Sequence, residues 1–210
     1  MLNRSSKLVS IKKLSTADRV RVISALVEGC SIRSTCRVTG VAKNTVVKLL
    51  RDAGCVCADY HHTHVRNVKA SRIQCDEIWS FVYSKAKNVP AKRKGEFGVG
   101  DVWTWVALDS ESKLCVSYML GLRDSGYATE FMQDVAERLA NRVQLTTDGH
   151  KAYLKAVAVV DFDADYAMLN KIFATDYAGA GRYSPPKCIG AIKNPIMGNP
   201  DPDLINTSFA

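Results

Sequence analysis

The chain has 210 residues, of which 47% are hydrophobic, and it carries a formal net charge of +8 with a sequence pI near 9.1. This length and composition exclude a disordered polypeptide, and no apolar run reaches the length that crosses a bilayer. Residues 1–72 hold 14 lysines and arginines against four acidic residues. Such a basic segment favours nucleic-acid binding, because phosphate neutralisation supplies most non-specific affinity. The alternative is a basic surface that serves only solubility.

The cysteines indicate a reducing environment. There are seven, an odd number, and four of them lie inside apolar periodic segments: Cys30, Cys36, Cys75 and Cys115. This pattern is typical of free thiols that act as small core residues. Residues 1–14 are charged and contain no apolar run, so we expect a basic arm and no secretory signal. We therefore predict a cytoplasmic protein without a membrane segment.

Three short helices are predicted after the basic arm, over residues 15–28, 31–39 and 41–53, with glycines at their ends. Three helices with a glycine-containing turn before the last one are typical of a helix-turn-helix, whose final helix enters the DNA major groove. Lys43, Asn44 and Thr45 begin that helix and are the candidates for base contacts. Lys48 is a further candidate for a contact to DNA. The candidates for contacts to the DNA phosphates are Arg33, Arg37 and Arg51.

The segment from Cys55 to His64 is rich in cysteine and histidine, and it allows two interpretations. It could be a zinc site, but its ligands are crowded into ten residues, whereas structural zinc sites separate their ligand pairs by a loop. We favour a polar connection and predict no helix beyond Gly54. The resulting domain prediction is a DNA-binding domain over residues 1–64, a linker over 65–72 and a second domain over 73–210.

The segment from Arg72 to Val82 is predicted to be a strand, and it carries two carboxylates at its centre, Asp76 and Glu77. A buried carboxylate costs several kcal/mol unless it is paired or bound to a metal. The acidic residues therefore either belong to a site or lie on the solvent face of an edge strand.

A similar short strand is predicted over residues 143–148. It ends in a further acid, Asp148, which is followed by glycine. Carboxylates at strand ends are where α/β folds place their chemistry. Asp76 and Asp148 on neighbouring strands could share a divalent cation such as Mg²⁺ or Mn²⁺, which carboxylates and phosphates bind. They are our candidate metal-binding and catalytic residues.

The remaining elements complete an α/β domain. A lysine-rich loop over residues 84–100 could follow a DNA backbone or be a solvated turn. We then predict a hairpin over residues 101–120, a helix from Ser125 to about Arg142, a helix over 150–157 and a weaker strand over 164–169. The order β-β-β-α-β-α-β, with acids on the first and fourth strands, favours a ribonuclease-H-like mixed sheet over a doubly wound sheet.

Four motifs in this order resemble the insertion sequence 1 class of bacterial DDE transposases. They are Gln74-Cys-Asp76-Glu77-Ile-Trp79-Ser-Phe81-Val82, Gly100-Asp101-Val-Trp103-Thr-Trp105-Val-Ala107-Leu-Asp109, Gly121-Leu-Arg123-Asp124 and Thr147-Asp148-Gly149-His150-Lys-Ala-Tyr153. The resemblance implies an oligomeric enzyme that cuts and joins double-stranded DNA at element ends. It also implies Mg²⁺ held by two aspartates and a glutamate, with Asp76 as the first acid and Asp148 as the second.

The resemblance also implies a third acid, a glutamate on a helix after the last strand. No glutamate follows Glu137 in this sequence. We therefore expect a domain shortened before its C-terminal helix, with an incomplete catalytic triad, no activity and an exposed apolar patch. The alternatives are a non-catalytic DNA-binding regulator of transposition and a ribonuclease-H-like nuclease that completes its acids with Glu77 or Asp101.

Overall fold

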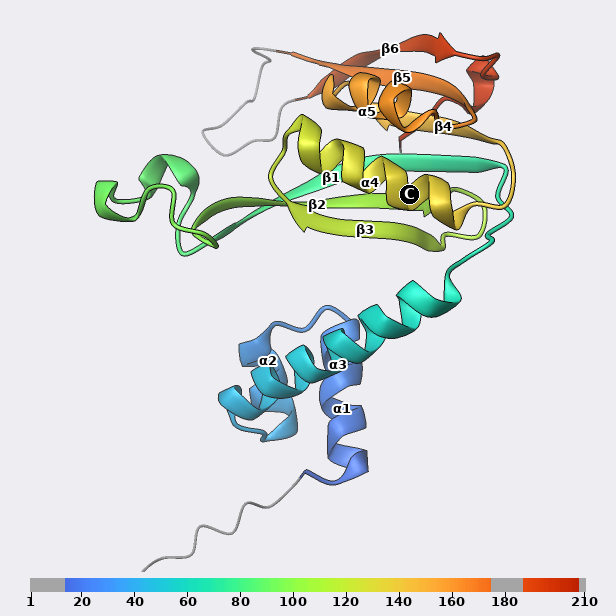
Figure 1. The fold of residues 1–210 in the computed structure, drawn as a ribbon. Helices are drawn as coiled ribbons and strands as arrows, with labels where there is room; N and C mark the ends of the chain where they lie inside the picture. The colour runs from blue at the N-terminus through green and yellow to red at the C-terminus, as the bar shows by residue number, and fades with distance from the viewer. Residues whose placement is uncertain (1–13, 175–186, 208–210) are drawn as a thin grey trace, which may run out of the picture. The chain divides into compact units, whose positions relative to one another are not determined.

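The computed structural model describes residues 14–174 and 187–207, so the predicted basic arm lies almost wholly outside the described residues. The chain divides into two compact units, residues 1–64 and residues 65–210 (Figure 1).

From residue 14 onward, the first unit contains three helices, α1 (Thr16–Val27), α2 (Ile32–Thr39) and α3 (Lys43–His64). Serine side chains cap the first two, because Ser15 Oγ accepts the Asp18 N–H and Ser31 Oγ accepts the Ser34 N–H. Gly40 ends α2 in the left-handed conformation. The three predicted helices are confirmed, together with the glycine turn before the third.

The predicted end of the third helix at Gly54 is wrong, because α3 continues to His64. The segment from Cys55 to His64 is therefore helical and not an irregular polar connection. A glycine inside a helix costs only about 1 kcal/mol relative to alanine, which neighbouring turns can offset. Here the Tyr60 and His64 rings stack with their centroids 3.9 Å apart, and Thr63 donates to the Asp59 carbonyl.

The core of the first unit is smaller than helical periodicity predicts. Val22 and Val46 are fully buried, as is the side chain of Thr35. Four other valine and leucine side chains of these helices are exposed: Val20, Val27, Val47 and Leu50. Three short helices cover too little surface to bury every apolar position of an amphipathic face.

The second unit is a mixed α/β domain built on a six-stranded sheet of order β3-β2-β1-β4-β5-β6 (Figure 1). The strands are β1 (Arg72–Val82), β2 (Gly100–Asp109), β3 (Cys115–Gly121), β4 (Val143–Asp148), β5 (Ala164–Phe173) and β6 (Cys188–Met197). β1 pairs antiparallel with β2 and parallel with β4, and β5 pairs parallel with β4 and antiparallel with β6. The predicted strands and the hairpin are confirmed, and β6 is an additional strand.

Helices α4 (Ser125–Arg138) and α5 (Ala152–Val160) pack next to each other on one face of the sheet (Figure 1). Asp124 caps α4, and the helix ends four residues before the predicted Arg142. The main core lies between these helices and the sheet, with Ile73, Trp105 and Phe131 among its fully buried side chains. This packing holds the middle strands in place and so fixes the side chains at their ends.

No α-helix follows α5 within the described residues, where only β5, β6 and the 3₁₀ turn η3 (Pro202–Leu204) are found. The turn leads to Ile205, which packs with Ala167 and Leu169 in a second, small cluster. Exposed apolar side chains line β5 and β6, including Ile172, Ile189 and Ile192.

The connection between β1 and β2 extends beyond the sheet and contains two short 3₁₀ helices, η1 (Ala86–Asn88) and η2 (Ala91–Arg93) (Figure 1). Arg93 pairs with Glu96 and stacks over the Tyr83 ring, and Lys85 lies over the Trp79 ring. Cations of the lysine-rich loop thus contact aromatic rings at the end of β1 and just after it.

We expect Gly121→Ala to destabilise the second unit. A Cβ at Gly121 would lie 2.1 Å from ring atoms of Tyr127, so the first turn of α4 would have to shift. Overpacking of this kind costs about 1–3 kcal/mol, measurable as the free energy of urea unfolding. Gly190→Ala is the matched control, because its Cβ would meet nothing closer than 4.0 Å. Equal unfolding free energies for the two variants would contradict the prediction.

Candidate functional site

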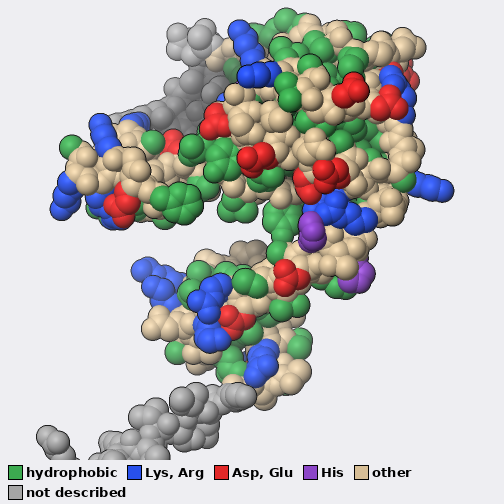
Figure 2. Space-filling view, viewed as in Figure 1, with side chains coloured by type: hydrophobic (Ala, Val, Ile, Leu, Met, Phe, Trp, Pro, Cys, Tyr) green, Lys and Arg blue, Asp and Glu red, His purple; other side chains and the backbone are tan. Residues whose placement is uncertain are grey.

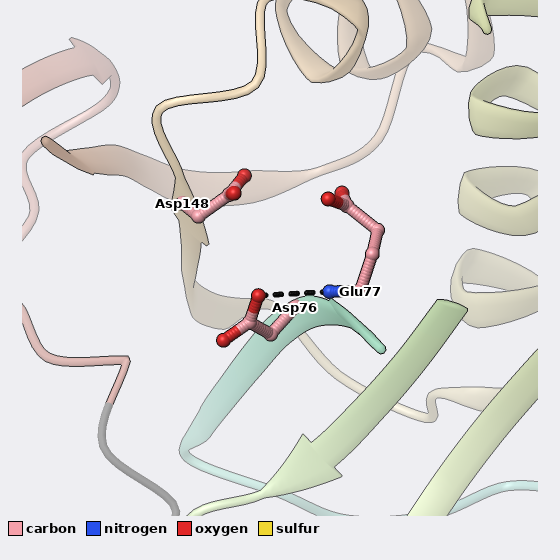
Figure 3. Close-up of side chains that lie close together, drawn as sticks. All are labelled: Asp76, Glu77 and Asp148. Carbon is pink, nitrogen blue, oxygen red and sulfur yellow. Dashed lines mark hydrogen bonds between the residues drawn. The ribbon is translucent and has the colours of Figure 1, made fainter. Parts of the chain in front are cut away.

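Three carboxylates meet where β1 and β4 part. The parallel pairing of these strands ends at the pair Cys75 and Thr147, so Asp76 and Asp148 are each the next residue of their strand. β1 continues beside β2, with Glu77 opposite Trp105. Beyond the last β1–β4 pair these two strands no longer pair with each other, and the three acidic side chains gather in the opening between them (Figure 3).

The carboxylates of Asp76, Glu77 and Asp148 offer one oxygen each within 4.8 Å of one another. Asp76 Oδ1 accepts the Glu77 N–H at 2.8 Å, and Asp148 Oδ1 accepts the His150 N–H at 2.9 Å. The structure therefore brings together the two aspartates that the sequence identified. Within residues 14–174 and 187–207, this is the only group of three or more such side chains close enough to hold a metal ion.

Glu77 was not part of the predicted two-aspartate site and was considered only as an acid of the alternative nuclease, and neighbouring residues of a strand normally point to opposite faces. Its carboxylate nevertheless reaches toward Asp148 (Figure 3), and its side chain is only 1% exposed. Glu77 Oε2 accepts from Arg123 Nε at 2.8 Å, while Oε1 is buried and has no hydrogen-bond partner. The Tyr153 hydroxyl interacts with this carboxyl without forming a well-aligned hydrogen bond.

The cluster is electrostatically costly without a bound cation. Burial raises the pKa of Asp76, and the charge of Asp148 adds to that rise, while the Glu77 N–H opposes it. Burial and Asp148 likewise raise the pKa of Glu77, and Arg123 and Tyr153 oppose the rise. Both shifts indicate that the site disfavours additional negative charge and would gain from a positive ligand.

Arg123, in the connection between β3 and α4, contacts two of the three acids directly. Its Nε donates to Glu77, and its terminal nitrogen lies 3.2 Å from Asp148 Oδ2. The guanidinium also lies over the Trp103 ring, 4.8 Å from its centroid. With about a third of its side chain exposed, Arg123 forms part of the wall of the opening rather than its floor.

A pocket of about 670 Å³ opens over Asp76 and Asp148. Cationic side chains line it beside the acids, namely Arg123, Lys151 and Lys171, together with His150. Burial and the nearby Arg123 lower the pKa of His150. Carboxylates on the floor and cations around them can accommodate a metal ion together with the phosphate of a nucleic acid.

The helix-turn-helix candidates all lie on exposed positions of α2 and α3. These are Lys43, Asn44, Thr45, Lys48, Arg33, Arg37 and Arg51. Figure 2 shows lysine and arginine side chains over these helices. Lys48 and Arg51 both form ion pairs with Asp52. The exposed placement agrees with a binding surface, and the role of each residue stays a prediction.

Comparison with known proteins gives only distant structural likeness. No family model matches the chain, and no curated protein matches its sequence. The solved structures to which the chain is similar include the Mos1 strand transfer complex, the Mos1 transposase paired-end complex with left transposon end, and a pre-cleavage Mos1 transpososome. Sequence identities are 13%, 13% and 11%, with TM-scores of 0.29, 0.29 and 0.27. The match covers 73% of this chain and 58–60% of the Mos1 chains, and at this level it assigns no function.

In the part of the chain that the structure describes, no helix is long and apolar enough to cross a membrane.

Proposed function

We propose that the chain is a DNA transposase of the DDE type that uses a divalent metal ion to cleave and rejoin phosphodiester bonds. The observation that carries this proposal is the meeting of Asp76 and Asp148 at the floor of a pocket lined by cations. Two adjacent acids from neighbouring strands suit a metal ion, and the surrounding lysines and arginine suit a phosphate backbone.

The topology supports a ribonuclease-H-like catalytic domain over residues 73–210. Its first three strands form an antiparallel meander, and β4 and β5 then run parallel to β1 on the other side. This order places the ends of β1 and β4 next to each other in the middle of the sheet. With the four motifs, the topology supports the insertion sequence 1 class in particular.

The donor set fits Mg²⁺ or Mn²⁺, because hard cations prefer carboxylate oxygens and Glu77 Oε1 is buried without a partner. Asp76 and Asp148 would hold the metal. A divalent ion in such a site lowers the pKa of bound water and stabilises charge on phosphoryl oxygens. The protein's own part is to keep the acids in place through backbone N–H groups and to attract phosphates with Lys151 and Lys171.

For the first unit we propose sequence-specific binding of the element ends by α3, with Lys43 and Asn44 facing the bases. The double variant Lys43→Ala/Asn44→Ala is expected to lose the preference for end DNA over random DNA by about 10–1,000-fold, which a fluorescence anisotropy titration measures. Lys7→Ala/Lys12→Ala, in the basic arm, is the matched control and should lower the affinity for end DNA and for random DNA by the same factor. Unchanged preference in the α3 variant would contradict this assignment.

Strand cleavage tests the proposed activity. The assay combines the full chain, Mg²⁺ or Mn²⁺, and a labelled duplex from the DNA that flanks the gene, and it measures nicking and strand transfer. The sequence alone predicts no activity, because the third acid of the resemblance is missing, but three carboxylates meet in this structure. We therefore expect activity in the wild type that is lost in Asp148→Asn and kept in Asp163→Asn, which removes an acid that pairs with Arg142 away from the pocket. Joining two ends requires more than one active site, so we also propose a homo-oligomer assembled on DNA in the cytoplasm.

A second candidate, a non-catalytic DNA-binding regulator of transposition, is favoured by one observation. Arg123 already pairs with two of the three carboxylates, which lets the site persist without a metal. Specific end binding without nicking in either metal would support the regulator.

A further inference from the structure

We propose that Glu77 is a third metal-binding carboxylate of this site and that Arg123 occupies the cation's place until the metal displaces it. This inference rests on the proposed metal-dependent function and adds two residues to its site. It assigns a role to a buried acid that is adjacent to Asp76 in the sequence.

The first support is the state of the Glu77 side chain. It is 1% exposed, and its Oε1 lacks a hydrogen-bond partner although it is buried. An ionised oxygen kept from water without a partner is costly, and a bound cation removes that cost. The carboxylate lies within ligand-sharing distance of Asp76 and Asp148, toward which it reaches (Figure 3).

The second support is the position of Arg123. One guanidinium contacts Glu77 at 2.8 Å and Asp148 at 3.2 Å, and so neutralises part of the charge of three neighbouring acids. It leaves Glu77 Oε1 unsatisfied, and its effect on Asp76 is a favourable charge interaction. A divalent ion neutralises more charge in less space, and each acid can give it an oxygen.

Arg123 can leave the acids without being left unpaired. About a third of its side chain is exposed, it lies over the Trp103 ring, and it lines the same pocket as Lys151 and Lys171. A guanidinium released there can bind a phosphate through two hydrogen bonds. Metal binding would thus exchange a closed, self-neutralised cluster for one that presents a metal ion and a free arginine to DNA.

The test is Mn²⁺ binding to the full chain by isothermal titration calorimetry, without DNA. Glu77→Gln is expected to weaken Mn²⁺ binding at least about tenfold, the smallest loss typical of residues that only support a ligand. Arg123→Gln is expected to tighten it about tenfold or more, because a competing charge close to the acids is removed. The matched controls are Glu96→Gln and Arg142→Gln, which break ion pairs elsewhere in this unit and should leave Mn²⁺ affinity unchanged.

The outcomes separate this inference from the proposed function. If Asp148→Asn abolishes Mn²⁺ binding while Glu77→Gln binds like its control, the metal site stands and the role of Glu77 is wrong. If Arg123→Gln binds Mn²⁺ no tighter than Arg142→Gln does, the proposed competition between Arg123 and the metal ion is wrong. A wild type that binds no Mn²⁺ overturns both the inference and the metal-dependent function. If Glu77→Gln fails to fold, Glu77→Asp replaces it in the comparison. This variant keeps the charge and moves the carboxylate away from the other two acids.

Discussion

Replacing Trp105 by alanine is expected to destabilise the second unit by about 3–5 kcal/mol, the usual cost of removing a fully buried aromatic side chain. Trp105 is 0% exposed, and its ring packs against Phe131 of α4 and Tyr153 of α5. Its indole N–H donates to the Leu122 carbonyl at 3.1 Å, so the alanine variant also leaves a carbonyl without that partner.

The same substitution should disturb the acidic cluster, because Trp105 lies opposite Glu77 on β2 and its ring contacts His150, two residues after Asp148. Urea unfolding followed by near-ultraviolet circular dichroism measures the loss of stability. Trp79→Ala is the matched control, because Trp79 is 39% exposed and its ring lies beside Phe81 and Lys85. Losses of similar size in the two variants would contradict the central role of Trp105 in the core.

The middle of the sheet could be predicted because its residues follow simple patterns. β1, β2 and β4 alternate or carry β-branched and aromatic residues, and they occupy the predicted ranges to within one residue. Asp76 and Asp148 were identifiable because each interrupts or ends an apolar strand, where a charge is costly. Local sequence was therefore sufficient to predict these three strands and to identify two of the three acids of the cluster.

Glu77 could not be placed from sequence, because strand alternation assigns it to the face opposite Asp76. Its position depends on the parting of β1 from β4 after Cys75, which is a property of the sheet and not of the segment. The one available signal was the pair of adjacent acids itself. Arg123 was equally hidden, since its contacts with Glu77 and Asp148 span 46 and 25 residues of sequence.

β6 was missed for a different reason. The segment from Cys188 to Met197 contains Gly190, Lys193 and Pro195, a composition typical of a loop. It forms the edge of the sheet, where a proline is tolerated because one side of the strand needs no hydrogen bonds. Pro195 pairs with Ala167 next to a register shift, which accommodates its missing N–H. Tertiary pairing with β5 thus overrides the local preference.

Asp76→Asn is expected to reduce metal-dependent DNA cleavage by about a thousandfold, the upper end of what removing one electrostatic contact in an active site costs. The substitution keeps the size of the side chain, and the amide oxygen can still accept the Glu77 N–H that Asp76 Oδ1 accepts now. The local backbone should therefore remain in place, and the loss should reflect the missing charge. Nicking rates on end DNA at saturating Mn²⁺ measure it.

The metal-free variant should at the same time be more stable than the wild type, by about 0.5–2 kcal/mol, as is common when a strained functional site is relieved. Asp76 is half-buried near Asp148, and a neutral side chain removes both the repulsion and the cost of burying a charge. Asp101→Asn is the control, because Asp101 accepts the Ala86 N–H outside the cluster. This substitution should leave the cleavage rate unchanged. A variant that cleaves at the wild-type rate would remove Asp76 from the site, whereas an inactive variant that melts at a lower temperature would show that Asp76 acts through the fold.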